Sequence, residues 1–197
     1  MYFTKTQVAI LKIFCSRITE SFSIKEISEK IKQNYSIVYS ALQDLYKNRF
    51  LIKDKHKIFS LNYKENHSDL AYIESLRAEE FLKKHIDIAL FIDEVIRKIN
   101  LGFFNLLLFG SFVEGKQRKI SDLDILIIIE NSEDVEKIEK QVKNISEKYG
   151  NFDCNVISKE SVKEMLIKKE KLNVINETLN KHVLFFGAEN YYRLIST

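Results

Sequence analysis

The chain has 197 residues, of which 45% are hydrophobic and 30% are charged, and its formal net charge is +3. This composition is globular, with enough apolar residues for one large or two small cores, and it excludes a disordered chain. No apolar run is long enough to cross a bilayer, and the run near the N-terminus has no cleavage site. We therefore expect a cytoplasmic protein without a membrane partner.

The positive charge is concentrated in the first third of the chain. Residues 1–65 contain 12 Lys and Arg against 6 Asp and Glu, whereas the rest of the chain has a small excess of acidic residues. A basic segment of this kind indicates a polyanionic partner. The alternative is a lysine-rich surface that is simply solvated.

The pattern of residues 3–63 predicts three helices followed by a β-hairpin. Apolar residues recur at helical spacing along residues 8–18, and Ser23 with Glu26 forms the capping box of a second helix. Asn34 is expected to cap a third helix, and Asn48 is expected to end it in a left-handed conformation. Strand-like runs follow at 51–53 and 57–61, joined by a short basic turn.

This order of elements resembles a winged helix-turn-helix domain. The resemblance implies that the third helix contacts the bases of duplex DNA and that the hairpin, or wing, contacts its phosphates. A winged helix used only for protein contacts is the alternative, and the basic charge favours DNA. The residues expected to contact DNA are Asn34, Tyr35, Ser36 and Tyr39 in the helix and Lys53, Lys55 and Lys57 in the wing.

Residues 66–100 have helical periodicity almost throughout and contain no Gly or Pro. We expect a helical connector that packs on the C-terminal half or forms the seam of a homodimer.

Two apolar runs, at residues 106–109 and 125–129, predict buried strands in the C-terminal half. Asp122 and Asp124 stand at the start of the second run. Residues two apart in a strand face the same side, so the two carboxylates should project together. Adjacent carboxylates repel each other unless a proton or cation lies between them, and oxygen ligands suit Mg²⁺ or Mn²⁺.

Gly110 and Ser111 follow the first run and predict a turn that binds phosphate. Glycine lets the backbone approach a ligand closely, and a helix beginning at Ser111 would offer free N–H groups to an anion. Each feature alone also fits an ordinary turn or a solvated strand face. Together with the acidic pair, however, the turn indicates a site for a metal-bound nucleoside triphosphate (NTP).

The spacing of Gly110-Ser111, Gly115 and Ser121-Asp122-Leu123-Asp124 resembles the signature of the DNA polymerase β-type nucleotidyltransferase superfamily, and especially its minimal nucleotidyltransferase branch. The resemblance extends over about residues 101–197. It implies transfer of a nucleoside monophosphate from an NTP to an acceptor, with release of pyrophosphate. It also implies that Asp122, Asp124 and Asp153 are catalytic and metal-binding, and that Gly110, Ser111 and Ser121 bind the nucleotide.

We therefore predict an α/β (α+β) protein in three parts. These are a winged helix-turn-helix domain at residues 1–65, a helical connector at 66–100 and a nucleotidyltransferase domain with a mixed sheet and flanking helices at 101–197. An amphipathic helix predicted at 134–148 lies between the strands of Asp124 and Asp153, and this order should bring Asp153 beside the acidic pair.

Two other hypotheses remain open. Glu114 stands where many relatives carry a basic residue, which favours a DNA-binding regulator whose C-terminal half is an inactive domain or a nucleotide sensor. The other hypothesis is an antitoxin-like module whose partner is a separate protein, such as a toxin. The three acidic residues favour catalysis instead, and a protein is one of the candidate acceptors.

Overall fold

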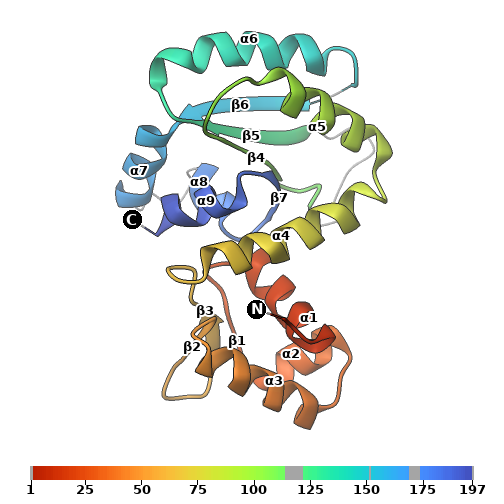
Figure 1. Ribbon diagram of the computed structural model, residues 1–197, viewed down its shortest axis with the longest axis vertical. Helices are drawn as coiled ribbons and strands as arrows, with labels where there is room; N and C mark the ends of the chain where they lie inside the picture. Colours follow the sequence, from red (N-terminus) through yellow and green to blue (C-terminus); the bar gives the residue numbers. More distant parts are fainter. Residues whose placement is uncertain (1, 114–121, 151, 169–173, 197) are drawn as a thin grey trace.

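The computed structural model describes residues 2–113, 122–150, 152–168 and 174–196. The chain forms an N-terminal body, residues 2–63, and a C-terminal body that follows it along the long axis of the molecule, with helix α4 (His67–Leu82) lying between them (Figure 1). Each body contains its own sheet, and the protein is a mixture of helices and strands.

The N-terminal body combines helices α1 (Lys5–Ser16), α2 (Ile24–Ile31) and α3 (Tyr35–Lys47) with a small antiparallel sheet. The strands are β1 (Ser21–Phe22), β2 (Leu51–Lys53) and β3 (Phe59–Leu61), in the order β1-β3-β2. The apolar faces of all three helices are buried in one core. Their helical periodicity therefore serves packing, and the charged residues remain on the outside.

Local side chains fix the ends of these helices. The capping box of α2 is formed as predicted, with the Ser23 hydroxyl accepting a hydrogen bond from the Glu26 backbone N–H at 3.3 Å. Asn34 occupies the N-cap of α3 but makes no capping hydrogen bond with its side chain. Asn48 does not take the expected left-handed conformation, because its φ is −90°; the next residue, Arg49, has φ +60° instead.

The C-terminal body is built on a mixed four-stranded sheet in the order β6-β5-β4-β7. Its strands are β4 (Phe104–Phe109), β5 (Leu123–Ile129), β6 (Phe152–Ser158) and β7 (His182–Phe186). β4 is antiparallel to both β5 and β7, whereas β5 and β6 are parallel. Parallel neighbours need a crossover, and helix α6 (Val135–Ser146), preceded by a short 3-10 turn (Ser132–Asp134), provides it.

The two faces of this sheet belong to different cores. Leu106 and Leu108 of β4 pack in a cluster with α6 and α5 (Ile86–Lys98). Leu107 and Phe109 point the other way, into a cluster that includes α9 (Ala188–Ile195), α4 and the helices of the N-terminal body. This second core is continuous across both bodies. Helices α7 (Lys159–Lys168) and α8 (Val174–Thr178) border the same face.

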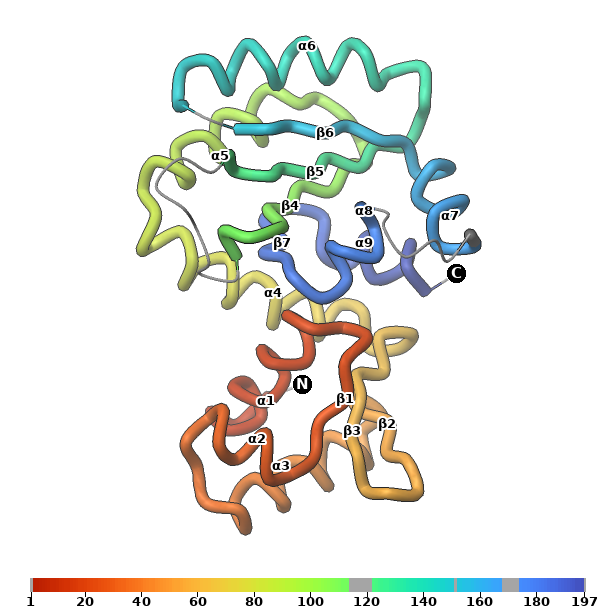
Figure 2. The backbone as a smooth tube through the Cα atoms, turned by 180° about the vertical axis from the view of Figure 1, so that it is seen from behind, coloured from red at the N-terminus to blue at the C-terminus, as the bar shows by residue number. Residues whose placement is uncertain are grey.

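Helix α4 lies between the two bodies, as the view from behind shows (Figure 2), and a buried polar network holds it against the C-terminal body. Glu74 of α4 is fully buried and accepts a hydrogen bond from the Tyr192 hydroxyl of α9 at 2.9 Å. Arg77 pairs with Glu74 and donates to the backbone oxygen of His182 in β7 at 2.6 Å. We call Glu74, Arg77, His182 and Tyr192 the Glu74 network. Within the described part of the chain, no helix is long and apolar enough to cross a membrane.

Candidate active site

Three acidic residues lie where strands β5 and β6 begin, at one end of the four-stranded sheet, and we call Asp122, Asp124 and Asp153 the carboxylate row. Asp124 is the second residue of β5, and its register partner in the parallel strand β6 is Asp153. Register partners on neighbouring strands face the same side of the sheet. Asp122 stands two residues before Asp124 and directly precedes β5. The crossover through α6 has thus placed Asp153 beside Asp124, as the order strand, helix, strand predicts.

The carboxylate row concentrates negative charge. The pKa of Asp124 is raised, first because the carboxyl is partly buried and then because of the negative charges of Asp153, Glu177 and Asp122. Asp122 and Asp153 are exposed, and neither forms an ion pair or a side-chain hydrogen bond with a described residue. Repulsion among these groups disfavours the ionised form of Asp124. A bound cation would remove that cost.

Glu177 is an acidic neighbour that the sequence analysis did not identify. It is the exposed residue of the short helix α8, and its negative charge contributes to the raised pKa of Asp124. Nothing in its local sequence distinguishes it from the many other surface glutamates of the chain. Only the packing of α8 beside the sheet reveals its proximity to the row.

Gly110 closes this end of the sheet against the carboxyl of Asp124. Its φ is +80°, a left-handed conformation that costs free energy in any residue with a Cβ. A Cβ added at this position would also collide with Oδ2 of Asp124. Glycine is therefore required on two counts, and the backbone at the end of β4 lies directly against the row.

The turn after Gly110 is only partly described. Ser111 is exposed and Ser111–Val113 form a turn, but a helix beginning at Ser111 would continue into residues 114–121, which lie outside the described residues. The predicted nucleotide-binding residue Ser121 and the unusual Glu114 lie in that segment as well. The described residues therefore bring together Gly110, Ser111 and the carboxylate row.

The donor chemistry of the row fits Mg²⁺ or Mn²⁺, since both prefer oxygen ligands and carboxylates supply negative charge. Among the residues described, no three His, Cys, Asp or Glu side chains are close enough to hold a metal ion as they stand. Binding would require the exposed side chains of Asp122 and Asp153 to rotate toward Asp124. The backbone already places all three on a common edge.

The residues expected to contact DNA lie at the opposite end of the molecule, on α3 and the β2–β3 hairpin (Figure 1). At the start of α3, Asn34 and Ser36 are exposed, and the side chains of Tyr35 and Tyr39 are 57% and 48% exposed. Ile37, between them, is also 45% exposed. This surface is therefore accessible, and it is more apolar than the sequence analysis anticipated.

The hairpin is ordered by the carboxylate of Asp54, which accepts hydrogen bonds at 2.8 Å from the backbone N–H groups two and four residues later. Lys55 and Lys57 are exposed at its tip. Lys53 is different, because its ammonium group lies 5.0 Å from the centre of the Tyr46 ring. Lys55 and Lys57 are thus the more available cations of the hairpin.

Comparison with known proteins gives one match that bears on the C-terminal body. Residues 103–189 match the model of the family described as polymerase beta, nucleotidyltransferase. The match runs from β4 to the start of α9 and includes Gly110 and the carboxylate row. It supports assignment of this part of the chain to the nucleotidyltransferase superfamily.

Two further comparisons are less informative. Among solved structures, the chain is similar to the crystal structure of the Thermotoga maritima IclR, with 21% sequence identity over 54% of this chain and 40% of that chain. The TM-score is 0.29, which is too low to indicate a shared fold. No curated protein matches the chain.

Proposed function

We propose that the C-terminal body is a metal-dependent nucleotidyltransferase that transfers a nucleoside monophosphate from an NTP to an acceptor. The family match supports nucleotidyltransferase-type function for residues 103–189. The observation that carries the finer proposal is the register pairing of Asp124 with Asp153 beside Gly110. It concentrates negative charge where a metal-bound triphosphate would lie against the end of β4.

In the proposed reaction, a nucleophilic oxygen or nitrogen of the acceptor forms a bond to the α-phosphorus of the NTP. The bond from that phosphorus to the oxygen bridging to the β-phosphate breaks, and pyrophosphate leaves. When bound, Mg²⁺ or Mn²⁺ would neutralise charge on the phosphates and favour in-line displacement.

Different residues would bind the metal ions, the acceptor and the phosphates. Asp122 and Asp124 would hold the metal ions, and Asp153 would bind on the acceptor side and orient or deprotonate the nucleophile. The backbone N–H groups at Gly110 and Ser111 would lie along the β- and γ-phosphates, because glycine permits close approach there. The raised pKa of Asp124, caused by its burial and its acidic neighbours, supports this arrangement, since those neighbours favour a bound cation.

Calorimetry with a non-hydrolysable NTP and Mg²⁺ tests the metal assignment. The single variants Asp122→Asn and Asp124→Asn should both lose most metal-dependent binding, and the double variant should lose little more, because all three changes disrupt one shared cluster. Asp134→Asn, in the acidic segment before α6, is the control and should bind normally. Unchanged NTP binding by the double variant would contradict the assignment.

Transfer itself is tested with radiolabelled NTPs against protein, tRNA and DNA acceptors. Asp153→Ala should retain much of the NTP affinity and lose transfer. A protein that binds NTPs but transfers to none of these acceptors would instead fit a nucleotide sensor. Full transfer by Asp153→Ala would show that Asp153 is not the third catalytic carboxylate.

We further propose that the N-terminal body is a winged helix that binds duplex DNA. The order of its elements, the β1-β3-β2 sheet, the exposed start of α3 and the basic charge of residues 1–65 support this proposal. The exposed Ile37 between Tyr35 and Tyr39 favours the competing proposal, a surface for a second copy of the chain or for a protein partner such as a toxin.

Gel shifts over a salt series separate the two proposals. Phosphate contacts release counterions, so Lys55→Glu with Lys57→Glu should weaken binding to every duplex and flatten the plot of log affinity against log salt by about 0.9 per lost contact. Changes at Tyr35, Ser36 or Tyr39 should alter sequence preference instead. Lys137→Glu with Lys140→Glu, on the exposed side of α6, is the charge-matched control. Absence of duplex binding at low salt would favour a protein partner.

A further inference from the structure

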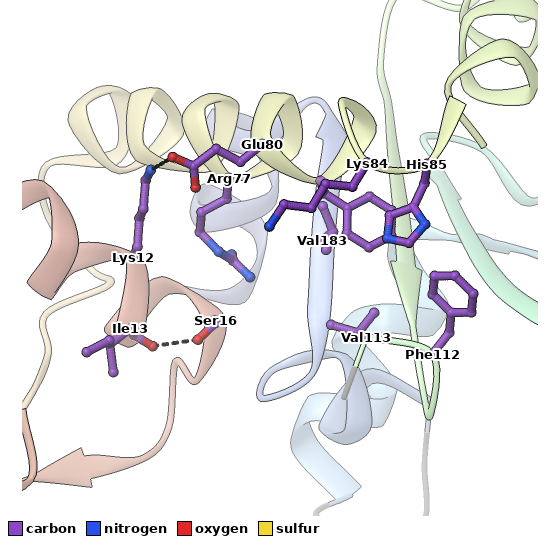
Figure 3. Close-up of a pocket in the computed structure, with 11 residues that line it drawn as sticks. Lys12, Ile13, Ser16, Arg77, Glu80, Lys84, His85, Phe112, Val113 and Val183 are labelled. Atoms are coloured by element: carbon purple, nitrogen blue, oxygen red, sulfur yellow. Dashed lines mark hydrogen bonds and ion pairs between the residues drawn. The ribbon is translucent and has the colours of Figure 1, made fainter. Parts of the chain in front are cut away.

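A cleft lies where the two bodies meet. Its walls are helix α1 of the N-terminal body, helix α4, strand β7 and the turn that follows β4 (Figure 3). The volume of the cleft is about 540 Å³. This is within the range of roughly 300–1,000 Å³ that is usual for small-molecule sites. We call this space the interdomain cleft; it is lined by Lys12, Ser16, Arg77, Lys84, Phe112 and Val183, among others.

The interdomain cleft is separate from the carboxylate row. His182 is the register partner of Phe109, and Phe109 is the partner of Asp124, so these three side chains face one side of the sheet. Val183 is the next residue of β7, so its side chain alternates to the other side of this strand, and it lines the cleft. None of the described residues that line the cleft belongs to the carboxylate row, so a ligand there would not need the carboxylates.

The charges that face the cleft are mainly positive. Lys84, near the end of α4, is exposed and forms no ion pair with any residue the structure describes. The ends of the Lys84 and Arg77 side chains are directed toward the same part of the cleft (Figure 3). Arg77 is held in place by its ion pair with buried Glu74, so its position is fixed before any ligand binds.

Lys12 adds a third cation from the other body. Its ammonium group pairs with Glu80 of α4 at 2.5 Å, and Glu80 is the one acidic residue among the described residues that line the cleft. The Glu80 side chain is 63% exposed and that of Lys12 is 22% exposed, so the carboxylate is the partner that can move away into solvent. Lys12 and Arg77 are each paired with a carboxylate, Glu80 and Glu74, so among the described residues of the cleft it is Lys84 whose uncompensated charge favours an anionic ligand.

One end of the cleft is aromatic. The rings of Phe81 and His85 are 4.5 Å apart, and Phe112 lies 5.3 Å from His85 and 6.1 Å from Phe81. Phe112 follows Ser111 directly and is only partly buried. Aromatic rings at one end and cations at the other suit a ligand that has a planar ring and a phosphate group.

We propose that the interdomain cleft binds a mononucleotide, with its phosphates toward Lys84 and Arg77 and its base against Phe112 and His85. Such a ligand would contact α1 of the N-terminal body and the turn next to Gly110 at once. Its binding would therefore couple the N-terminal body to the end of β4. The proposal goes beyond the transferase function and requires neither the metal ions nor the transfer step.

The test is nucleotide binding without metal. Calorimetry in EDTA on the full chain carrying Asp122→Asn and Asp124→Asn would use ATP, GTP, CTP, UTP, AMP and pyrophosphate as ligands. At least one nucleotide should bind, and adding Lys84→Glu should weaken it by about tenfold or more, the loss expected for one charge-assisted contact. Lys83→Ala is the control, because Lys83 pairs with Glu79 outside the cleft and should not affect binding.

The contact between the base and Phe112, and the coupling between the two bodies, are each tested by a separate measurement. Phe112→Leu should weaken nucleotide binding and leave any pyrophosphate binding unchanged. In hydrogen exchange, the bound nucleotide should protect both residues 12–16 and residues 112–113. The proposal is overturned if no nucleotide binds in EDTA, if Lys84→Glu binds normally, or if pyrophosphate binds as tightly as every nucleotide. Because the variants lack the carboxylate pair, these results are independent of whether the protein transfers nucleotides.

Discussion

Two shielded carboxyl groups of this protein have opposite electrostatic surroundings. Glu74 is fully buried, and burial alone would raise its pKa, but Arg77, His182 and the Tyr192 hydroxyl outweigh that effect and hold the pKa below its usual range. Asp124 is only partly buried, yet its pKa is raised, because burial is reinforced by Asp153, Glu177 and Asp122.

The difference separates a carboxylate whose charge the protein compensates from one whose charge it does not compensate. The protein itself supplies a positive charge and a hydrogen bond to Glu74, and the Glu74 network holds α4 against β7 and α9 of the C-terminal body. Around Asp124 the protein supplies further negative charge. Such an arrangement costs stability unless something else binds there, which is typical of functional sites.

Removing Glu74 should have the largest effect on stability. Glu74→Ala leaves the almost buried Arg77 without its partner and should lower the free energy of unfolding by about 3–5 kcal/mol, measured by urea denaturation. Adding Arg77→Met should recover part of the loss, since no unpaired charge remains. Glu79→Ala, which removes an exposed carboxylate from the same helix, should change stability little. Equal losses in the two single variants would contradict the structural role of Glu74.

Gly110→Ala should have the second largest effect on the free energy of unfolding. The left-handed backbone and the collision with Asp124 together should cost about 1–3 kcal/mol in the same assay. Gly150→Ala is the comparison, because its φ is +117° and no atom lies within 4 Å of an added Cβ. The backbone at Gly150 is the less favourable of the two for a residue with a Cβ, so a larger cost at Gly110 would show the contact with the carboxylate row. A smaller cost at Gly110 than at Gly150 would mean that Gly110 is required only by its backbone conformation.

Asp124→Asn should stabilise the protein, whereas the loss of Glu74 should destabilise it. Without divalent ions, removal of the charge relieves the repulsion and should raise Tm by roughly 1–3 °C, as a gain of under 1 kcal/mol would in a chain of this length. Mg²⁺ should raise the Tm of the wild-type protein and not that of Asp124→Asn. A lower Tm for Asp124→Asn in EDTA would mean that the carboxylate is stabilising and that its acidic neighbours do not dominate.

The smallest effect is a pH dependence with opposite signs at the two sites. Since the pKa of Glu74 is lowered, its ionised form stabilises the protein above the ordinary glutamate pKa, and that contribution is lost as pH falls through the lowered value. Since the pKa of Asp124 is raised, stability decreases as pH rises from the ordinary aspartate value, about 3.9, through the raised value.

Urea denaturation of the wild type, Glu74→Gln and Asp124→Asn from pH 3 to pH 7 would measure this difference. The loss caused by Glu74→Gln should shrink toward acid pH, and so should the gain caused by Asp124→Asn. The two curves should therefore lie on opposite sides of the wild type at neutral pH and approach it at low pH. If both curves lay on the same side of the wild type, the prediction that Glu74 and Asp124 affect stability with opposite signs would be wrong.

Much of the secondary structure was predictable because its causes are local. β2 occupies the residues expected of it, and the capping box at the start of α2 is formed. Local signals were less reliable where two neighbouring residues compete for one conformation. Asn48 is the better left-handed residue by propensity, but Arg49 adopts that conformation where the chain turns from α3 into β2.

The sequence by itself determined the chemistry of the candidate active site. Two acids separated by one residue at the start of a strand must lie near each other, and glycine at the end of the preceding strand permits close approach. What only the tertiary structure decided is which distant residues join them. Asp153 reaches Asp124 through the register of β5 and β6, and Glu177 through the packing of α8.

The same holds for the two features that no motif signals, the Glu74 network and the interdomain cleft. Both include residues of α4 and β7, which are far apart in the sequence. Arg77 and His182, which are joined by a hydrogen bond, are 105 residues apart. Alternating or helical periodicity fixes which face of an element is buried, because neighbouring residues share one backbone geometry. It does not fix which other element covers that face, since that depends on the free energy of packing the whole chain.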